Sequence, residues 1–349
     1  MPRVAIVIPT WNKAGLLAQA LQSLRAQTYP IDRVIVVDNG STDDSASVAT
    51  RAGAHVISLA ANSGFASAVN RGLQEAASAD WIGVLNNDVS LAPDWLAQIM
   101  AKLEPGNSWF ATGKLLDARK HEQIDGSFDA VCRGGCAWRC GHGRLDSPLW
   151  NQPRNIQLAP FTATVFRSAL FERVGQLDET FGSYLEDVDF GLRCAAAGLS
   201  GVYVPEAVGY HQGSATLGRW HPDTVRKIAR NQLLLVAKHY PPNWVLRYGW
   251  PVFIAQTLWG FVALRHGALF SYLAGKVEGL GEFRKARGKH GASSPGGDHF
   301  SAIGQFSATI EFSTIDQFSA IIDLSEKQIR DIQQATGFDL YWRLYFALT

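Results

Sequence analysis

Three polar side chains follow an apolar run in the stretch WIGVLNNDVSLAPDWL, residues 81–96. Residues 81–85 are typical of a buried strand, and Asn86, Asn87 and Asp88 come directly after it. Because alternate residues of an extended chain point the same way, Asn86 and Asp88 can present two oxygens on one side. Such oxygens suit a hard divalent cation, Mg²⁺ or Mn²⁺, which often bridges to a diphosphate. One carboxylate binds such an ion weakly, so we expect a metal site that a phosphorylated ligand completes.

Three other apolar runs also end in polar residues. The segments are PTWN at 9–12, DNGSTDD at 38–44 and ANSGFASAVNRG at 61–72. The carboxyl ends of parallel strands meet at one edge of a sheet, and ligands bind at that edge. A single Asp after a strand more often caps the next helix. Four such ends together predict a polar crevice.

The side-chain chemistry of several residues in these segments suggests what each could bind. Asp38 can accept hydrogen bonds from a base or a ribose. Ser41 and Thr42 can cap a helix whose N-terminus faces anionic groups. Gly64 allows a close backbone approach. Arg71 can meet a phosphate, and the alternative is an ordinary surface arginine.

The first hundred residues alternate between strand and helix patterns. Strands are predicted at 3–9, 33–38, 54–59 and 81–86, and helices at 14–27, 41–53 and 64–78. Strands that are apolar on both faces predict an α/β fold with a mostly parallel sheet flanked by helices.

The next hundred residues are less regular. Residues 105–160 have weak periodicity and predict irregular loops with short strands. A strand and a helix are expected at 160–175. A further helix is expected within 184–198, starting near Glu186. Residues 200–218 predict a strand followed by a loop that carries His211.

Composition is that of a globular protein and excludes few partners. The chain has 349 residues, is 47% hydrophobic and has a net charge of +1, which indicates no nucleic-acid partner. Residues 226–290 hold eleven Lys and Arg against two Glu, which indicates an anionic surface nearby, phospholipid or a phosphorylated ligand. The four cysteines contain no C-x-x-C pair, and residues 1–12 do not look like a signal peptide, so a reducing compartment is expected.

The C-terminal third contains a strongly apolar segment at 244–275 and a tail of different character. The uninterrupted apolar stretch from Tyr248 to Leu264 falls short of the ~20 residues that span a bilayer. An interfacial or re-entrant helix pair at a membrane is predicted, and an ordinary buried helix is the alternative. The tail, 291–349, predicts a linker, a low-complexity repeat and a short helix with Ser325 and Gln328 as a capping box. We assign it no role.

Six blocks together resemble the family-2 glycosyltransferases, above all the bacterial branch with rhamnosyl- and galactofuranosyltransferases. They are VIPTWN, VVDNGSTDDS, NSGFASAVNRG, LNNDV, FERVGQLDETFGSYLEDVDFGLRCAAAG and VYVPEAVGYHQGSAT. The resemblance runs from about Val4 to Lys289. It implies the GT-A fold, a nucleotide-sugar donor such as dTDP-rhamnose or a UDP-sugar, and a divalent metal, Mg²⁺ or Mn²⁺.

The resemblance also implies roles for individual residues. Asp38 matches the acid that reads the nucleoside. Asp88 matches the surviving acid of the D-x-D metal motif, with Asn86 in its first acidic place, and His211 matches the histidine that completes the metal site. Asp187 matches the general base.

Other residues are assigned around these. Asp189 is the rival base, and Glu186 can hold the acceptor. The residues expected to bind the nucleotide-sugar are Pro9, Thr10, Trp11, Asn12, Asp38, Asn39, Ser41, Asn62, Gly64, Phe65, Asn70, Arg71, Asn86 and Asn87.

The expected domains are a GT-A catalytic domain at 1–222, a membrane-associating helical segment at 223–290 and the tail. The catalytic domain divides into a nucleotide-sugar half, 1–104, and an acceptor half, 105–222. We expect an inverting glycosyltransferase that acts on a lipid-linked or cell-surface glycan at the cytoplasmic face of the inner membrane. Two alternatives stay open. A nucleotidyltransferase would need a Gly-rich loop with a Lys after the first strand, and PTWNKAG is a poor version of it. A catalytically inactive nucleotide-sugar binder is the other.

Overall fold

The computed structural model of the chain describes residues 1–213, 220–288 and 315–349. Its strands are β1 (Val4–Thr10), β2 (Arg33–Asp38), β3 (His55–Ser58), β4 (Trp81–Leu85), β5 (Val89–Leu91), β6 (Phe110–Asp117), β7 (Lys120–Gly126), β8 (Asp129–Val131), β9 (Ala137–Arg139), β10 (Arg154–Ile156), β11 (Ala163–Arg167) and β12 (Gly201–His211). Its α-helices are α1 (Ala14–Arg25), α2 (Ser45–Arg51), α3 (Phe65–Glu75), α4 (Trp95–Leu103), α5 (Ala169–Val174), α6 (Glu186–Ala196), α7 (Pro222–His239), α8 (Trp244–Arg265), α9 (Leu269–Gly288), α10 (Ile315–Thr336) and α11 (Leu340–Leu348).

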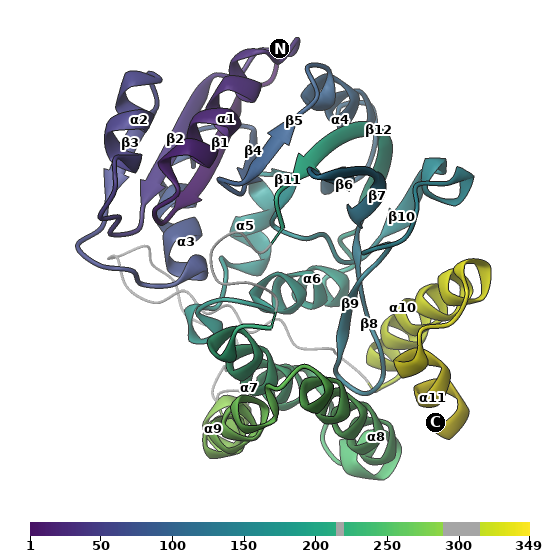
Figure 1. Cartoon of the computed structure of the whole chain (residues 1–349). Coiled ribbons are helices and arrows are strands. Elements are labelled where there is room, and N and C mark those ends of the chain that lie inside the picture. Colours follow the sequence, from purple (N-terminus) through teal and green to yellow (C-terminus); the bar gives the residue numbers. More distant parts are fainter. Residues whose placement is uncertain (214–219, 289–314) are drawn as a thin grey trace, which may run out of the picture.

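One large sheet organises the upper part of the molecule (Figure 1). The strand order is β10-β12-β6-β11-β4-β1-β2-β3. β1 pairs in parallel with β2 and with β4, and β2 pairs in parallel with β3, while β11 is antiparallel to both β4 and β6. The predicted α/β fold with a mostly parallel, helix-covered sheet is confirmed.

The interpretation of residues 105–160 as loops with short strands was wrong for residues 110–117, which form β6. β6 is a long strand in the middle of the sheet, and its residues from Phe110 to Leu116 are buried. A strand covered on both faces lacks the apolar–polar alternation that marks a half-exposed strand, so its pattern was weak. Gly113 is required there because a Cβ at that position would lie 2.0 Å from the Ala207 carbonyl oxygen.

The interpretation of His211 as a loop residue was also wrong. His211 is the last residue of β12, and it is opposite Val89 in the antiparallel pair that β12 forms with β5. The short strand β5 directly follows Asp88. This pairing therefore brings the side chains of Asp88 and His211 together, although they are far apart in the sequence.

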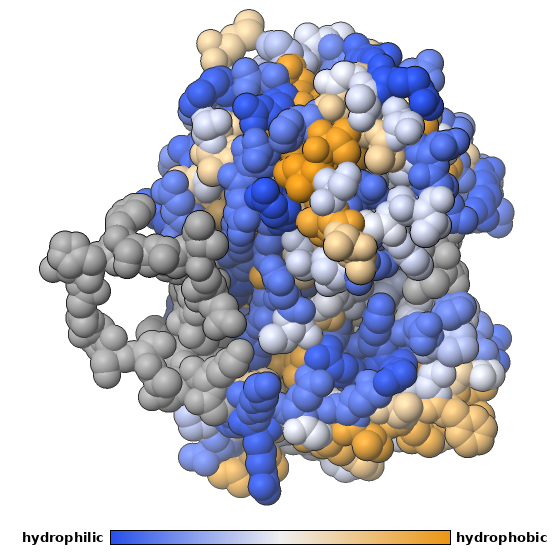
Figure 2. Space-filling view, turned by 90° about the vertical axis from the view of Figure 1, so that its left-hand side faces the viewer, coloured by the Kyte–Doolittle hydropathy of each residue, from blue (hydrophilic) through white to orange (hydrophobic). Residues whose placement is uncertain are grey.

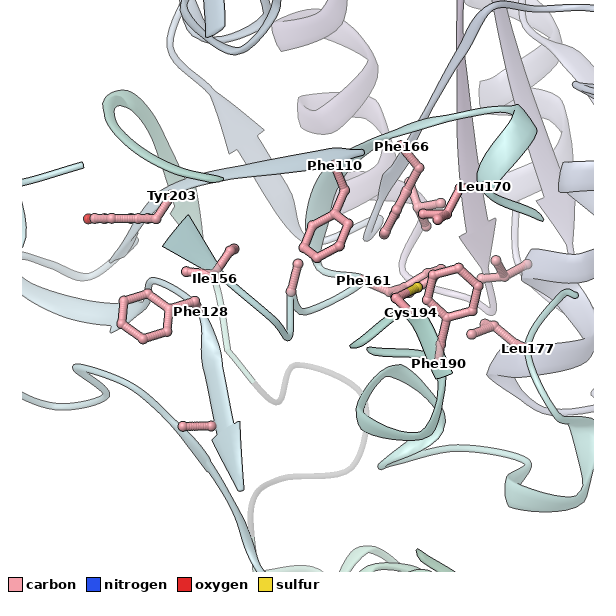
Figure 3. Packing of buried hydrophobic residues seen from close by; sticks show 14 of the residues in the cluster. Phe110, Phe128, Ile156, Phe161, Phe166, Leu170, Leu177, Phe190, Cys194 and Tyr203 are labelled. Atoms are coloured by element: carbon pink, nitrogen blue, oxygen red, sulfur yellow. The ribbon is translucent and has the colours of Figure 1, made fainter. Parts of the chain in front are cut away.

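Aromatic rings from α6, from β11 and from the segment before β11 form a cluster that supports the position of α6. Figure 3 shows Phe161, Phe166 and Phe190 packed around Leu170 and Cys194. The ring centroids of Phe161 and Phe190 are 5.2 Å apart in an edge-to-face arrangement, a favourable geometry for aromatic pairs. All three rings are fully buried.

The lower part of the molecule is helical (Figure 1). No helix in the described ranges is both long enough and apolar enough to cross a membrane. The predicted linker at 291–298 lies outside the described residues. The capping box at Ser325 was wrong, because α10 begins at Ile315 and Ser325 lies inside it.

Candidate active site

Polar residues from the ends of β1, β2 and β4 are joined in one hydrogen-bond network. The Asn87 side-chain amide donates to Thr10 Oγ1 at 2.8 Å and to the Asn12 carbonyl oxygen at 3.3 Å. The Asn12 N–H donates to Ser41 Oγ at 2.8 Å, and the Ser41 N–H donates to Asp38 Oδ1 at 3.0 Å. The structure thus brings these predicted donor-binding residues to one sheet edge. Pro9 lies buried in β1, and Trp11 follows it half-buried.

Asn39 and Asn62 are used mainly to hold the loop that precedes α3. The Asn39 amide donates to Asn62 Oδ1 and to the Gly64 carbonyl oxygen, both at 3.1 Å. Gly64 has φ +92°, and a Cβ there would lie 2.9 Å from the Gly182 carbonyl oxygen. The close approach that Gly64 permits is therefore between two segments of the chain. Phe65 begins α3 beside them.

Asn70 and Arg71 are placed away from this network. The buried Asn70 amide donates to the Leu177 carbonyl oxygen at 2.9 Å and to Glu179 Oε1 at 3.0 Å, and it accepts from the Leu177 N–H. Arg71 is exposed on α3, where its guanidinium lies 3.5 Å from Gln74 Oε1. We do not retain these two residues in the donor site, because Asn70 holds the loop before α6 and Arg71 lies on the surface.

His211 lies between two carboxylates at the other side of the β4 end. Its Nε2 is 3.2 Å from Asp88 Oδ1, and its Nδ1 is 2.7 Å from Asp125 Oδ2. Burial by itself would lower the pKa of His211, but the hydrogen bonds to Asp125 and Asp88 outweigh it and raise the pKa to about 9. Burial would raise the pKa of Asp125, and the hydrogen bond from His211 lowers it instead.

The donor atoms of this group fit a divalent cation. Asp125 engages Nδ1 of His211, which leaves Nε2 facing Asp88, and a carboxylate that orients a metal-binding histidine in this way is common. The Asn86 Oδ1 atom is buried with no hydrogen-bond partner among the described residues. Within those residues, no three or more His, Cys, Asp and Glu side chains are arranged to hold an ion by themselves. Asp88 and His211 lie side by side, and their role as metal ligands stays a prediction.

Glu186 and Asp187 begin α6 after an unusual backbone turn. Tyr184 and Leu185 both have left-handed conformations, with φ of 74° and 68°, which cost free energy in residues other than glycine. The buried Asn231 amide holds this turn by donating to the Tyr184 carbonyl oxygen at 2.7 Å and to the Ser183 carbonyl oxygen at 3.0 Å. The chain therefore maintains a strained turn that aims the start of α6.

The two acids at this turn differ in environment. Asp187 is half-buried and accepts from the Val188 N–H at 2.9 Å. Burial raises the pKa of Asp187, and the Arg139 guanidinium opposes part of that rise. Burial and the neighbouring Asp187 raise the pKa of Glu186 well above its ordinary value, and Glu186 Oε2 has no hydrogen-bond partner among the described residues. Glu186 is therefore suited to donate a hydrogen bond, and Asp187 to accept a proton.

Arg139 on β9 connects the two halves of the site. Its Nε is 3.7 Å from Asp129 Oδ1, and it also interacts electrostatically with Asp125 and Asp187. Burial raises the pKa of Asp129, and Arg139 counteracts it. A continuous run of charged groups thus leads from Asp88 to Asp187. The sequence interpretation missed Asp125, Asp129 and Arg139, although two acids four residues apart in IDGSFDA were a usable signal.

The rival base Asp189 serves the fold. It is fully buried, and its carboxylate contacts Lys238 Nζ at 2.6 Å, His239 Nε2 at 2.8 Å and an Arg193 nitrogen at 3.1 Å. Three nitrogen donors enclose this carboxylate and leave no access for a substrate hydroxyl. Asp187 is therefore the candidate base of the pair.

Comparison with known proteins agrees with this geometry. The family model for glycosyl transferase family 2 matches residues 5–126. The N-acetylglucosaminyl-diphospho-decaprenol L-rhamnosyltransferase of Mycobacterium tuberculosis is 28% identical over 288 residues, which cover 74% of this chain and 90% of that protein. The O-antigen biosynthesis protein RfbC of Myxococcus xanthus is 28% identical over 224 residues, or 62% of this chain and 18% of that protein.

Two solved structures show the same fold. GalNAc-T7 with UDP, GalNAc and Mn²⁺ superposes with a TM-score of 0.60 at 13% identity, covering 97% of this chain and 58% of that one. The mannosyltransferase PcManGT of Pyrobaculum calidifontis, in complex with GDP-Man and Mn²⁺, gives a TM-score of 0.51 at 16% identity, covering 99% and 86%. The chain therefore has the GT-A fold, matches the family 2 glycosyltransferase model over residues 5–126 and is a glycosyltransferase.

Proposed function

We propose that this chain is an inverting transferase that moves a sugar from a nucleotide-sugar to a hydroxyl of a lipid-linked glycan. The observation that carries the proposal is the run from Asp88 through His211, Asp125 and Arg139 to Asp187. This run supports a metal site at Asp88 and His211 and a base at Asp187 within one site, beside the polar edge formed by the ends of β1, β2 and β4.

The chemistry follows from these positions. A divalent ion bound at Asp88 and His211 would supply positive charge for the diphosphate leaving group. Asp187 takes the proton of the acceptor hydroxyl while that oxygen bonds to the anomeric carbon and the bond to the diphosphate breaks. Arg139 offsets part of the cost of burying the Asp187 charge, and Glu186 donates a hydrogen bond to the acceptor. A single displacement of this kind inverts the anomeric configuration.

The donor and acceptor classes are proposed from relatives. The M. tuberculosis relative is named as a rhamnosyltransferase that acts on a sugar linked to decaprenyl diphosphate. This supports dTDP-rhamnose as the first donor to test, UDP-sugars as the next, and a polyprenyl-diphosphate glycan as the acceptor. It also supports a role in cell-wall or polysaccharide synthesis.

Metal and donor binding are tested by thermal shift. With Mn²⁺, one nucleotide-sugar should raise the melting temperature, because a ligand that binds the native state stabilises it by mass action. At a donor concentration of ~100 Kd the stabilisation is about 2.7 kcal/mol. EDTA, or the substitution Asp88→Asn, should remove most of the shift, whereas Asp80→Asn, at an exposed site, should leave it intact. A full shift in EDTA would contradict the metal site.

The acceptor class calls for a membrane surface, and α8 with α9 offers an apolar one. Apolar side chains gather along the lower edge of the molecule in Figure 2, at the level of α8 and α9 in Figure 1. The exposed residues there are Val245, Leu246, Trp250, Phe253, Phe261, Leu264, Phe270, Leu273, Val277 and Leu280. Exposed cations on the same helices include Arg247, Arg265, Arg284 and Lys285. We propose that this face lies on the anionic cytoplasmic leaflet of the inner membrane.

Vesicle sedimentation tests the membrane contact. The wild type should bind phosphatidylglycerol-containing vesicles more tightly than pure phosphatidylcholine vesicles. Leu246→Glu and Phe270→Glu, at side chains exposed by 92% and 86%, should weaken binding at least about tenfold, since each charge would enter an apolar environment. Leu145→Glu is the matched control, because Leu145 is 63% exposed outside α8 and α9. Equal binding by all four proteins would contradict the proposed face.

A further inference from the structure

The helix α10 holds the hairpin that carries Asp129 and Arg139. We infer that Ser325 and Glu326 of α10 are positioning residues for the catalytic cluster, acting through hairpin β8–β9. The inference rests on the proposed function, in which Arg139 faces the base Asp187.

Two polar side chains of α10 make the contact, although they come about 190 residues later in the sequence. Ser325 Oγ accepts a hydrogen bond from the Val131 N–H at 2.7 Å. Glu326 Oε2 accepts from the Arg133 N–H at 2.8 Å, and Glu326 Oε1 accepts from Arg133 Nε at 2.9 Å. Tyr345 of α11 donates to the same carboxylate at 2.9 Å. The inward face of α10 is thus used to satisfy the backbone of the hairpin.

The two α10 side chains that make these contacts are buried, so they constrain the hairpin strongly. Ser325 is 2% exposed and Glu326 5% exposed. A buried carboxylate is costly unless it is paired and hydrogen-bonded, and here three donor groups satisfy it. If the hairpin moved, the charge of Glu326 would lose its partners. Burial therefore couples the position of the hairpin to that of α10.

Residues outside α10 also hold the hairpin tip. Gln256 of α8 donates to the Gly134 carbonyl oxygen at 2.9 Å, and Tyr240 donates to the Arg133 carbonyl oxygen at 2.7 Å. In the hairpin register, Val131 is opposite Ala137 and Asp129 is opposite Arg139. The α10 contacts lie toward the tip and begin two pairs beyond the Asp129–Arg139 pair. A displaced tip therefore moves Arg139 relative to Asp187.

If Ser325 and Glu326 position the hairpin, their loss should lower turnover without weakening donor binding. The donor edge is built from β1, β2 and β4, which do not contain the hairpin. The charged and titratable groups that face Asp187 are Arg139 on β9, Asp129 on β8 and Glu186 on α6. When Arg139 withdraws, Asp187 should hold its proton to higher pH, and the acidic limb of the kcat profile should move to higher pH.

Steady-state kinetics and hydrogen exchange on full-length variants test the inference. Glu326→Ala should lower kcat by about 10- to 100-fold with the donor KM within about twofold, since misplacement near 1 Å costs about that much. Glu326→Gln and Ser325→Ala should each lose less. Lys327→Ala, which removes an exposed ion pair with Asp331 on the same helix, should match the wild type. Amides 129–139 should exchange faster in Glu326→Ala, and amides 81–91 should not.

Either result on the hairpin is decisive. A Glu326→Ala protein could have a lower melting temperature but keep the wild-type kcat, pH profile and hairpin exchange. That result would overturn the inference, because α10 would then stabilise the fold without positioning the hairpin. Should Glu326→Ala fail to fold, Ser325→Ala carries the same comparison. If the wild type transfers no sugar, the proposed function fails by itself, and the exchange measurement still shows whether Glu326 fixes the hairpin.

Discussion

Asp187→Asn should lower turnover by about 10²- to 10⁴-fold, the range that general base catalysis contributes. Asparagine has the shape of aspartate and can still accept from the Val188 N–H, but it cannot take a proton from the acceptor hydroxyl. Donor binding depends on the ends of β1, β2 and β4 and should change little. Turnover and the donor-dependent thermal shift, measured on the same preparation, separate the two effects.

The control for this variant is Asp94→Asn. Asp94 lies at the start of α4, much as Asp187 lies at the start of α6. The helix α4 packs against β12 and β6, and Asp94 is not part of the run of charged groups from Asp88 to Asp187. It should turn over like the wild type. An Asp187→Asn enzyme that keeps more than about half of its turnover would remove Asp187 as the base. A wild type that binds donor and never turns over would support the inactive-binder alternative.

Asp189→Asn should destabilise the fold by about 3–5 kcal/mol, which is the usual effect of removing one partner from a buried ion pair. The substitution removes the carboxylate that pairs with the buried Arg193 and with the half-buried Lys238, although Lys238 keeps its ion pair with Asp178. Urea unfolding should show a lower midpoint at pH 7. Asp187→Asn is the matched control two residues away, because the folded state does not favour the charge of Asp187, as its raised pKa indicates.

The same group predicts a pH dependence. Burial would raise the pKa of Asp189, but Lys238 and Arg193 outweigh it and hold the pKa well below its ordinary value. Stability from this carboxylate is therefore complete above its unfolded pKa of about 3.9 and is lost as pH falls toward the folded value. The wild type should lose stability below about pH 4 more steeply than Asp189→Asn. Parallel curves for the two proteins would contradict this account of the network.

The polar edge at the ends of β1, β2 and β4 could be predicted from the sequence because its signals are local, and donor binding there stays a prediction. The parallel strands β1, β2 and β4 are followed by or end in polar residues such as Thr10, Asp38 and Asn87, and parallel strands must place those ends together. The sequence pattern could not separate residues that face a ligand from those that hold the chain. Asn70 and Gly64 belong to conspicuous segments, yet they fix the approach of α3 to the loop before α6.

The catalytic side depends on contacts that no local pattern records. Asp125 and Arg139 join the site only because β7 and the hairpin β8–β9 lie beside β12 and α6. The Ser325 signal was misleading for a similar reason. Its spacing to Gln328 is that of a capping box, but the hydroxyl binds the Val131 N–H from the middle of a longer helix, a tertiary contact over 194 residues.

The most direct test of the central claim is a sugar-transfer assay with a polyprenyl-diphosphate N-acetylglucosamine acceptor. The enzyme is incubated with Mn²⁺ and, in turn, dTDP-rhamnose and UDP-sugars, and the lipid product is identified by mass spectrometry and its anomeric configuration by NMR. We predict one extra sugar on the lipid in inverted configuration, from one donor, absent with EDTA and with Asp187→Asn. A product with retained configuration, or one formed equally by Asp187→Asn, would contradict the assignment of Asp187 as the base of a single displacement.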